Sequence, residues 1–323
     1  MRRRGPLTVL ALTLALVAAV ACGGSDDEAE PSATTQAESP AATEPGGAGA
    51  RVTVEEAGSE PRERLRLRLT ADSTTRAAMV SKTSLEMTMA GERLPGGTLP
   101  TTRTVIEQRI DRVDPDGTAH FTVKFTDWSV EPTPGADPDV SEQTERVLRQ
   151  LSGLGGTGTI SPSGVQTLTM DTSTVSDPTI KSLLDSMSSQ IGNLTVPFPE
   201  EPVGPGARWR GTSSATISGI TMNTTTNYTL RSRTGDRYEL DVEQEAEAPA
   251  GRIDFPGLPP GAETSIERFG LESSGNVTGD LTKPLPATSN IRGGGEGRLT
   301  FSAEGEQGTV DQRVTLEIAL SPA

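Results

Sequence analysis

The chain has 323 residues, with 44 acidic and 29 basic side chains, a formal net charge of −15 and 3% aromatic residues. The acidic balance argues against nucleic acid as a partner, because nucleic-acid binding needs basic patches, and against electrostatic adhesion to anionic lipid headgroups. Because aromatic residues are so sparse, any core must be built mainly from aliphatic side chains.

Residues 1–21 have the features of an export signal. Arg2–Arg4 form a basic region, and Leu7–Ala21 is an apolar segment too short for a comfortable membrane span. Small residues precede Cys22, the single cysteine of the chain. This segment resembles the signal peptide of bacterial lipoproteins, which implies cleavage before Cys22 and covalent attachment of a diacylglycerol to its sulfur. The alternative is an ordinary secretory signal.

Acylation of Cys22 would determine where the protein resides and which chemistries it lacks. We expect a lipid-anchored protein on the extracytoplasmic face of the cell membrane, because two adjacent acyl chains hold firmly where one holds only marginally. No thiol would remain for disulfides, metal ligation or nucleophilic catalysis. Loss of the three leader arginines would lower the net charge to about −18, which favours solubility at a membrane surface.

Residues 22–60 are expected to carry the lipidated cysteine on a disordered tether. From Gly23 to Gly58 the chain is mainly Ser, Thr, Ala, Glu, Pro and Gly, so it cannot bury enough apolar surface to offset its ordering entropy. A flexible chain of roughly 35 residues would hold the domain about 30–35 Å from the anchor. The remainder, 61–323, is long enough for one β-rich domain, or for two lobes at 61–200 and 201–323.

Alternation of apolar and polar residues dominates this remainder and predicts antiparallel strands with one buried and one solvated face. The apolar positions are Leu65, Leu67 and Leu69; Leu85, Met87 and Met89; Phe121, Val123 and Phe125; Tyr238, Leu240 and Val242; and Val314, Leu316, Ile318 and Leu320. Turn sequences occur at Asp114–Gly117, Ser161–Gly164 and Thr234–Asp236. Gly293–Gly295 is interpreted as a flexible turn.

Two stretches show helical spacing instead. One runs from Val140 to Leu151; the other runs from Asp177 to Ile191, with Asp177 suited to an N-cap and Pro178 to the first helical position. Their apolar stripes are typical of helices that pack on a sheet, and the alternative is that they line an apolar cleft. The residues of this cleft would be Val147, Leu148, Leu151, Ile180, Leu183, Leu184, Met187 and Ile191.

A weak internal repeat adds to this pattern. The order of strand, polar strand, tight hairpin and return strand runs from Arg76 to Phe125 and recurs from Arg208 to Val242. We therefore expect a mainly β fold, with curved antiparallel sheets from two related halves, half-barrel or sandwich-like, and two short helices.

Three segments resemble a family of uncharacterised exported bacterial lipoproteins that share a domain of unknown function. They are Thr157–Val165, Pro202–Trp209 and Asn227–Leu230. The resemblance covers about Leu65 to Leu320, and its motifs are a hairpin and a strand entry. It implies no catalytic residues for this chain.

Few residues could carry chemistry. His120 is the single histidine and lies on the solvent-facing side of its predicted strand, which disfavours a Ser-His-Asp arrangement. One histidine and no free cysteine are too few ligands for a zinc site. Asp114–Gly117 is only faintly similar to a calcium loop and is better interpreted as a hairpin turn. An acidic row could attract a cation or a basic partner, although such rows are usually just solvated: Glu239, Asp241, Glu243 and Glu245.

The expected function is that of a non-enzymatic binding module anchored to the membrane. We expect no metal and no cofactor apart from the diacylglycerol on Cys22, and a partner that is either an apolar small molecule, such as a lipid, or an envelope protein. Fold-level analogy with lipid-carrying exported lipoproteins favours the apolar ligand. Two alternatives remain: an envelope assembly or sensing module that acts through protein contacts, and a carboxylate-based hydrolase, which needs two carboxylates within about 5–10 Å in a cleft.

Overall fold

The computed structural model describes residues 51–94, 97–173, 195–217, 220–253, 263–303 and 306–323. In this part of the chain, antiparallel strands dominate and one helix, α1 (Pro138–Leu151), is present. The strands are β1 (Arg51–Glu56), β2 (Thr74–Met89), β3 (Glu92–Arg93), β4 (Gly97–Thr98), β5 (Thr101–Val113), β6 (Ala119–Glu131), β7 (Gly155–Ile160), β8 (Gln166–Met170), β9 (Arg208–Ile217), β10 (Ile220–Thr234), β11 (Arg237–Ala248), β12 (Gly251–Ile253), β13 (Glu263–Asp280), β14 (Thr288–Ala303) and β15 (Glu306–Pro322).

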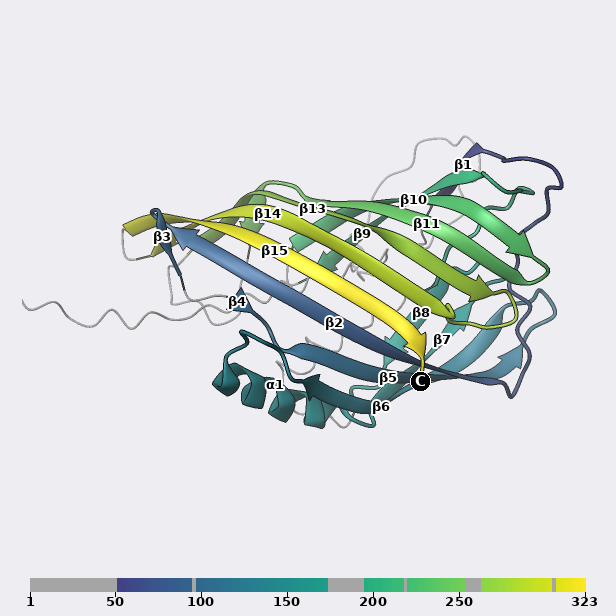
Figure 1. Cartoon of the computed structure of the whole chain (residues 1–323), viewed down its shortest axis with the longest axis horizontal. Helices are drawn as coiled ribbons and strands as arrows, with labels where there is room; N and C mark the ends of the chain where they lie inside the picture. The colour runs from purple at the N-terminus through teal and green to yellow at the C-terminus, as the bar shows by residue number, and fades with distance from the viewer. Residues whose placement is uncertain (1–50, 95–96, 174–194, 218–219, 254–262, 304–305) are drawn as a thin grey trace, which may run out of the picture.

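All of these strands belong to one open, curved sheet, which confirms the predicted mainly β, antiparallel class (Figure 1). The strand order is β1-β9-β10-β11-β13-β14-β15-β2-β5-β6-β7-β8; β12 pairs with β13, and β3 and β4 pair with β2. The C-terminal strand β15 pairs with β2 from Val310↔Met89 to Pro322↔Ala77, so strands from both predicted lobes share the sheet. That two related halves build it stays a prediction.

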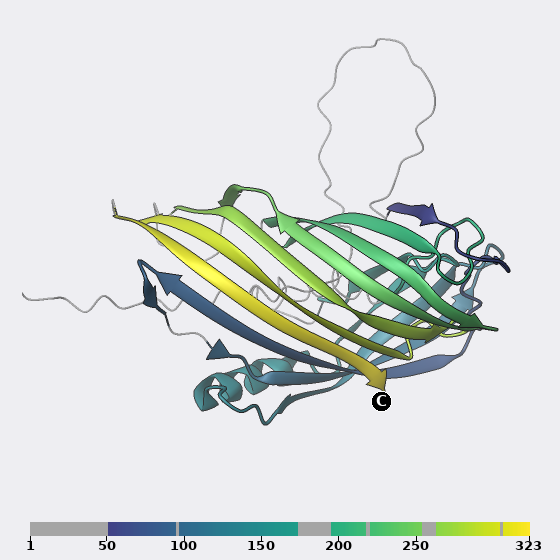
Figure 2. The same cartoon turned by 45° about the horizontal axis from the view of Figure 1, so that its top comes forward.

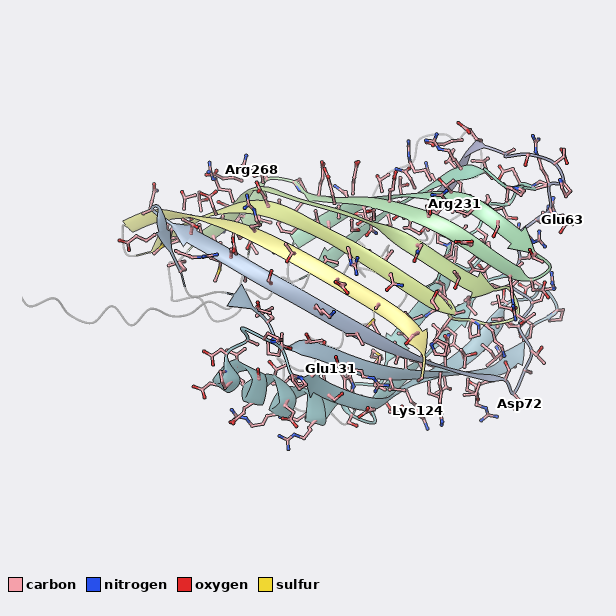
Figure 3. The ribbon with its side chains drawn as sticks, viewed as in Figure 1. Glu63, Asp72, Lys124, Glu131, Arg231 and Arg268 are labelled. Atoms are coloured by element: carbon pink, nitrogen blue, oxygen red, sulfur yellow. The ribbon has the colours of Figure 1, made fainter. Side chains whose placement is uncertain are left out.

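The curvature gives the sheet an inner and an outer face. The long strands β13, β14, β15 and β2 cross the molecule side by side, and β5–β8 fold back beneath β9–β11 (Figures 1 and 2). Residues alternate between the faces, as along β11, where buried and exposed positions follow one another. Charged side chains project outward, such as Arg268 above and Lys124 below in Figure 3.

Ion pairs cross the outer face between neighbouring strands. Arg313 of β15 pairs with Glu296 of β14 at 2.6 Å, and Arg298 of β14 pairs with Asp311 of β15 at 2.7 Å. These groups are well exposed, so each pair adds little to stability. The register of β14 and β15 places these opposite charges directly across from each other, however, and the charged side chains keep the outer face solvated.

The main core lies between the two parts of the folded sheet. Its fully buried side chains include Trp209 and Leu230 from one part and Phe121 and Ile110 from the other. Phe198, which precedes β9, packs edge-to-face on Tyr238 of β11, with ring centroids 5.3 Å apart. A smaller core cluster lies further along the long strands: Ala246, Ala248, Ile253, Ile266, Phe269, Leu271 and Leu316.

The helix expected from Val140 to Leu151 is confirmed as α1. Asp137 is its N-cap and accepts a hydrogen bond from the amide of Asp139 at 2.8 Å, while Pro138 occupies the first helical turn. The second predicted helix, from Asp177 to Ile191, lies outside the described residues.

The expectation that the tether extends to residue 60 is wrong for residues 51–56. They form β1, which pairs with β9 through Val52↔Gly211 and Val54↔Trp209. The two valines point toward the interior and pack against the main core. This short segment therefore gains ladder hydrogen bonds and apolar contacts, which the mainly polar composition of the surrounding residues did not predict. Residues 22–50 lie outside the described residues.

The alternating leucines at 65–69 do not form a strand. Leu65 and Leu67 are buried as the alternation predicts, but they lie outside the strands, and the backbone of this segment is hydrogen-bonded to loops. Leu67 donates its amide to the carbonyl of Pro162 at 2.7 Å, and Arg68 donates to that of Leu281 at 2.7 Å. Both partners lie between strands, so no ladder forms.

The glycine triplet also differs from its prediction, because Gly293–Gly295 lies inside β14 rather than in a turn. A Cβ on Gly295 would lie 2.3 Å from the carbonyl oxygen of Gly270 and 3.1 Å from Cδ1 of Leu271. The missing side chain therefore lets β13 approach β14 closely and lets Leu271 lie across it.

The three predicted turns are confirmed. Asp114–Gly117 closes the β5–β6 hairpin, with the amide of Gly117 donating to the carbonyl of Asp114 at 2.9 Å. Ser161–Gly164 joins β7 to β8, and Thr234–Asp236 joins β10 to β11. Each turn contains a glycine with positive φ, a conformation in which L side chains are strained.

Candidate functional site

The inner face of β13, β14, β15 and β2 is free of charge at its described positions. Register and burial place every second residue of Phe269–Val277, Ile291–Phe301, Val310–Leu320 and Ala77–Met89 on this face. These residues are apolar, glycine or uncharged polar. We call this surface the inner face of the long strands. Because every charged residue of the same stretches falls at the alternate positions, the two faces differ sharply in polarity.

Part of this surface is apolar and incompletely covered. Met87, Met89, Val310 and Phe301 are only half-buried, and none of them belongs to either core cluster. The ring of Phe301 extends over Gly308, where a Cβ would lie 2.2 Å from Cζ. Methionine side chains are flexible and polarizable, so they adapt to apolar surfaces of varied shape. The inner face of the long strands can therefore accept apolar contacts beyond those the core supplies.

Two side chains of β5 and β6 add buried polar atoms without partners. Gln108 is 1% exposed, yet neither Oε1 nor Nε2 makes a hydrogen bond. The indole Nε1 of Trp128 is likewise buried and without a partner. Trp128 pairs with Thr104, and Thr104 pairs with Met79 of β2, so the inner face of the long strands continues onto β5 and β6.

A third buried polar group of the inner surface is fully paired. Gln244 of β11 is 6% exposed, and its Nε2 donates to the hydroxyl of Thr226 at 3.2 Å. Its Oε1 accepts from the hydroxyl of Ser273 at 3.4 Å. The three residues lie on β10, β11 and β13 and form a chain across the strands. A buried glutamine on this sheet can thus be satisfied by its strand neighbours.

The structure brings together only two of the residues predicted for the apolar cleft. Leu148 and Leu151 of α1 are buried in the main core, which fits the interpretation of core packing, whereas Val147 is 36% exposed. The remaining cleft residues, Ile180, Leu183, Leu184, Met187 and Ile191, lie outside the described residues, as does Cys22. Sequence reasoning did not single out Gln108, although its place between Ile106 and Ile110 in the alternation puts it on the buried face.

His120 lies on the outer side of β6 and lines a hollow of about 490 Å³, to which β7 and β8 contribute four threonines. Its Nε2 is 2.7 Å from Oδ2 of Asp114 and 2.8 Å from a guanidinium nitrogen of Arg112. Among the described residues, no hydroxyl that could act as a nucleophile bonds to the imidazole. The group is therefore a solvent-facing cluster of opposite charges at the end of a hairpin.

The acidic row of β11 also lies on the outer face. Asp241 pairs with Arg231 of β10, and Glu245 stands directly opposite Glu272 of β13. In the part of the chain that the structure describes, no three His, Cys, Asp or Glu side chains gather closely enough to hold a metal ion. No described helix is long and apolar enough to cross a membrane.

The clear pKa shifts have local structural causes. A hydrogen bond from the hydroxyl of Thr282, followed by one from its backbone amide, holds the pKa of Asp280 below its usual range. Burial raises the pKa of Tyr238, whose ring lies in the main core, so this phenol stays neutral. Neither group is among the inner-face positions of the long strands, and the described residues at those positions are apolar, glycine or uncharged polar, so none of them titrates.

Residues 184–283 match DUF6263, a family of unknown function. The match covers less than half of the chain and includes two of the three segments, Pro202–Trp209 and Asn227–Leu230, that suggested an uncharacterised exported family. No curated protein matches the chain. The similarity supports a domain of unknown function in this region.

Proposed function

We propose that the protein is a non-enzymatic, lipid-anchored binding protein of the extracytoplasmic membrane face, and that it holds an apolar ligand on the inner face of the long strands. The observation that carries the proposal is the polarity of this surface. Its described positions are uncharged, and four of its apolar side chains are half-buried outside both core clusters. Apolar surface of this kind, rimmed by a charged outer face, is typical of ligand and interaction sites.

The dimensions favour a hydrocarbon chain as the ligand. From Met79 to Met89 the strand spans roughly 33 Å, at about 3.3 Å per residue. One leaflet of a bilayer is about 15 Å deep, half of the hydrocarbon thickness. A lipid acyl chain therefore fits along the strand, and each methylene that it buries contributes about 0.8 kcal/mol before the costs of association.

The expected anchor places the domain where such ligands are found. A diacylglycerol on Cys22 would hold the chain at the membrane surface, within reach of lipids that enter or leave the bilayer. The net negative charge of the chain supports the same proposal, because it disfavours adhesion of the charged outer face to anionic headgroups.

A matched pair of neighbouring variants tests the proposal. Met87 lies on the inner face and Thr88 on the outer face, so Met87→Lys and Thr88→Lys place the same charge on opposite sides of β2. The binding of Nile red, a neutral apolar dye, is titrated by fluorescence with the mature-length chain carrying Cys22→Ala. We expect Met87→Lys to weaken binding at least tenfold and Thr88→Lys to leave it unchanged. Equal affinities in the two variants would contradict the proposal.

A further inference from the structure

Two of the described methionines lie outside the packed core. Met87 and Met89 are half-buried and belong to neither core cluster, whereas Met170 is 6% exposed in the main core. Met79 and Met222 are also half-buried, but they pack against the main cluster and the smaller cluster, respectively. The thioethers of Met87 and Met89 are therefore the described sulfur atoms that a small solute can reach while both clusters stay packed.

These two methionines lie on the proposed binding surface, at neighbouring positions of one face of β2. They are two residues apart on the strand, so their side chains lie roughly 7 Å apart. Across β15, Met89 pairs with Val310 and Met87 pairs with Gln312. Val310 offers no hydrogen-bond donor, and Nε2 of Gln312 leans away from β2, 2.8 Å from where a Cβ of Gly297 would lie. A polar group on either sulfur would therefore change the surface without finding a ready donor across β15.

Peroxides convert the thioether of methionine into such a polar group. The sulfur loses two electrons and gains one oxygen atom, the O–O bond of hydrogen peroxide breaks, and the second oxygen leaves as water. The product, methionine sulfoxide, is polar where the thioether was apolar. Methionine sulfoxide reductases reverse the step, because thiols supply two electrons and the oxygen leaves as water. The modification is therefore reversible.

We propose that Met87 and Met89 form a reversible oxidation site, through which peroxide releases the apolar ligand from the inner face of the long strands. This inference rests on the proposed function and adds its regulation. A bound apolar ligand would strip water from the sulfoxide oxygen and offer no hydrogen bond in return, which disfavours the complex. The expected location favours the same chemistry, because the extracytoplasmic space is oxidising and acylation of Cys22 would leave methionine as the reactive sulfur.

The position of these methionines outside the core separates the loss of binding from unfolding. Oxidation of Met170 would place a polar group among the side chains of the main core and destabilise the fold. Oxidation of Met87 and Met89 leaves both core clusters intact. Binding should therefore fall while the stability of the ligand-free chain stays nearly constant.

The test uses the mature-length chain carrying Cys22→Ala, so that methionine supplies all of its sulfur. After brief treatment with hydrogen peroxide, peptide mass spectrometry measures the sulfoxide fraction at each methionine, and Nile red is titrated by fluorescence. We expect Met87 and Met89 to be oxidised before Met170, and the oxidised chain to bind Nile red about fivefold more weakly. Methionine sulfoxide reductases of both stereospecificities should restore the affinity, and the urea midpoint should shift little.

Leucine variants assign the effect to particular sulfur atoms. Met87→Leu combined with Met89→Leu removes both thioethers, so the affinities before and after peroxide should be equal, whatever the starting affinity. Met170→Leu keeps both thioethers and should retain the loss. If the combined variant fails to fold, each single variant replaces it and should show a smaller loss than the parent chain.

Three results would overturn the inference while the proposed function stands. They are an unchanged Nile red affinity when Met87 and Met89 are fully oxidised, an equal loss in the combined leucine variant, and a loss that appears only as the urea midpoint falls. Failure of the untreated parent chain to bind Nile red would instead overturn the proposed function, and this inference with it.

Discussion

Substitution of Gly295 tests whether the glycine-rich stretch is the middle of a strand. The residue faces inward on β14, and a Cβ there would lie 2.3 Å from the carbonyl oxygen of Gly270 and 3.0 Å from Cα of Leu271. Both atoms belong to the backbone of β13, so Gly295→Ala can be accommodated only if two paired strands separate. Gly270 offers a matched control on β13, because nothing lies within 4 Å of its Cβ position and its φ is not positive.

The structure predicts that the two substitutions change the free energy of unfolding in opposite directions. Forcing an extra group into a packed contact costs about 1–3 kcal/mol, and the lower entropy of the unfolded chain returns about 0.4–1 kcal/mol. We expect Gly295→Ala to lower the free energy of unfolding by about 1–2 kcal/mol. Gly270→Ala retains only the entropic gain, so it should raise the free energy of unfolding by up to about 1 kcal/mol.

Urea unfolding of the mature-length chain, followed by circular dichroism, measures both values. If the glycine triplet were a flexible surface turn, the two alanines would have similar and small effects. Equal free energies of unfolding for Gly295→Ala and Gly270→Ala would therefore refute the assignment of these residues to paired strands.

Three further predictions concern the core, acid stability and the anchor. The buried indole of Trp209 donates to the carbonyl of Pro197 at 3.0 Å, so Trp209→Phe should lower the free energy of unfolding by about 1–3 kcal/mol, and an unchanged urea midpoint would count against this contact. The lowered pKa of Asp280 contributes stability that is present above the unfolded pKa near 4 and is lost as the pH falls through the folded pKa. Thr282→Val should shift the NMR titration of the Asp280 carboxyl toward its usual range, and an unshifted titration would exclude the hydroxyl as the cause. Cys22→Ala should move the chain from the membrane fraction to the soluble fraction of an exporting bacterial cell, and retention in the membrane would argue against lipidation.

The strands could be predicted where alternation alone determines the outcome. In the first part of each of β6 and β11, at Ala119–Phe125 and Tyr238–Val242, every second residue is apolar, and the same residues are buried in the structure. Leu65 and Leu67 alternate equally well, but the amides of Leu67 and Arg68 donate to carbonyls in the loops that follow β7 and β13, and these contacts are distant in the sequence. The sequence did not predict the burial of the valines of β1, because they lie in a mainly polar segment and are buried through pairing with the distant strand β9.

The candidate site was less accessible to sequence reasoning. Alternation already placed Met87 and Met89 on the buried face of a strand, but whether a buried face is covered by core or left partly open is a property of the assembled sheet. Gln108 shows the same limit. Its neighbours Ile106 and Ile110 predict its burial, whereas the lack of a partner depends on residues of other strands.

Native mass spectrometry tests the central claim, that the inner face of the long strands holds an apolar ligand, most directly. The mature-length chain carrying Cys22→Ala is exported by a bacterial host and purified without detergent. The account predicts a species heavier than the polypeptide by the mass of a neutral lipid, and this added mass should disappear when the protein is denatured in organic solvent. A spectrum that contains only the mass of the polypeptide, from a folded chain that also fails to bind Nile red, would contradict it.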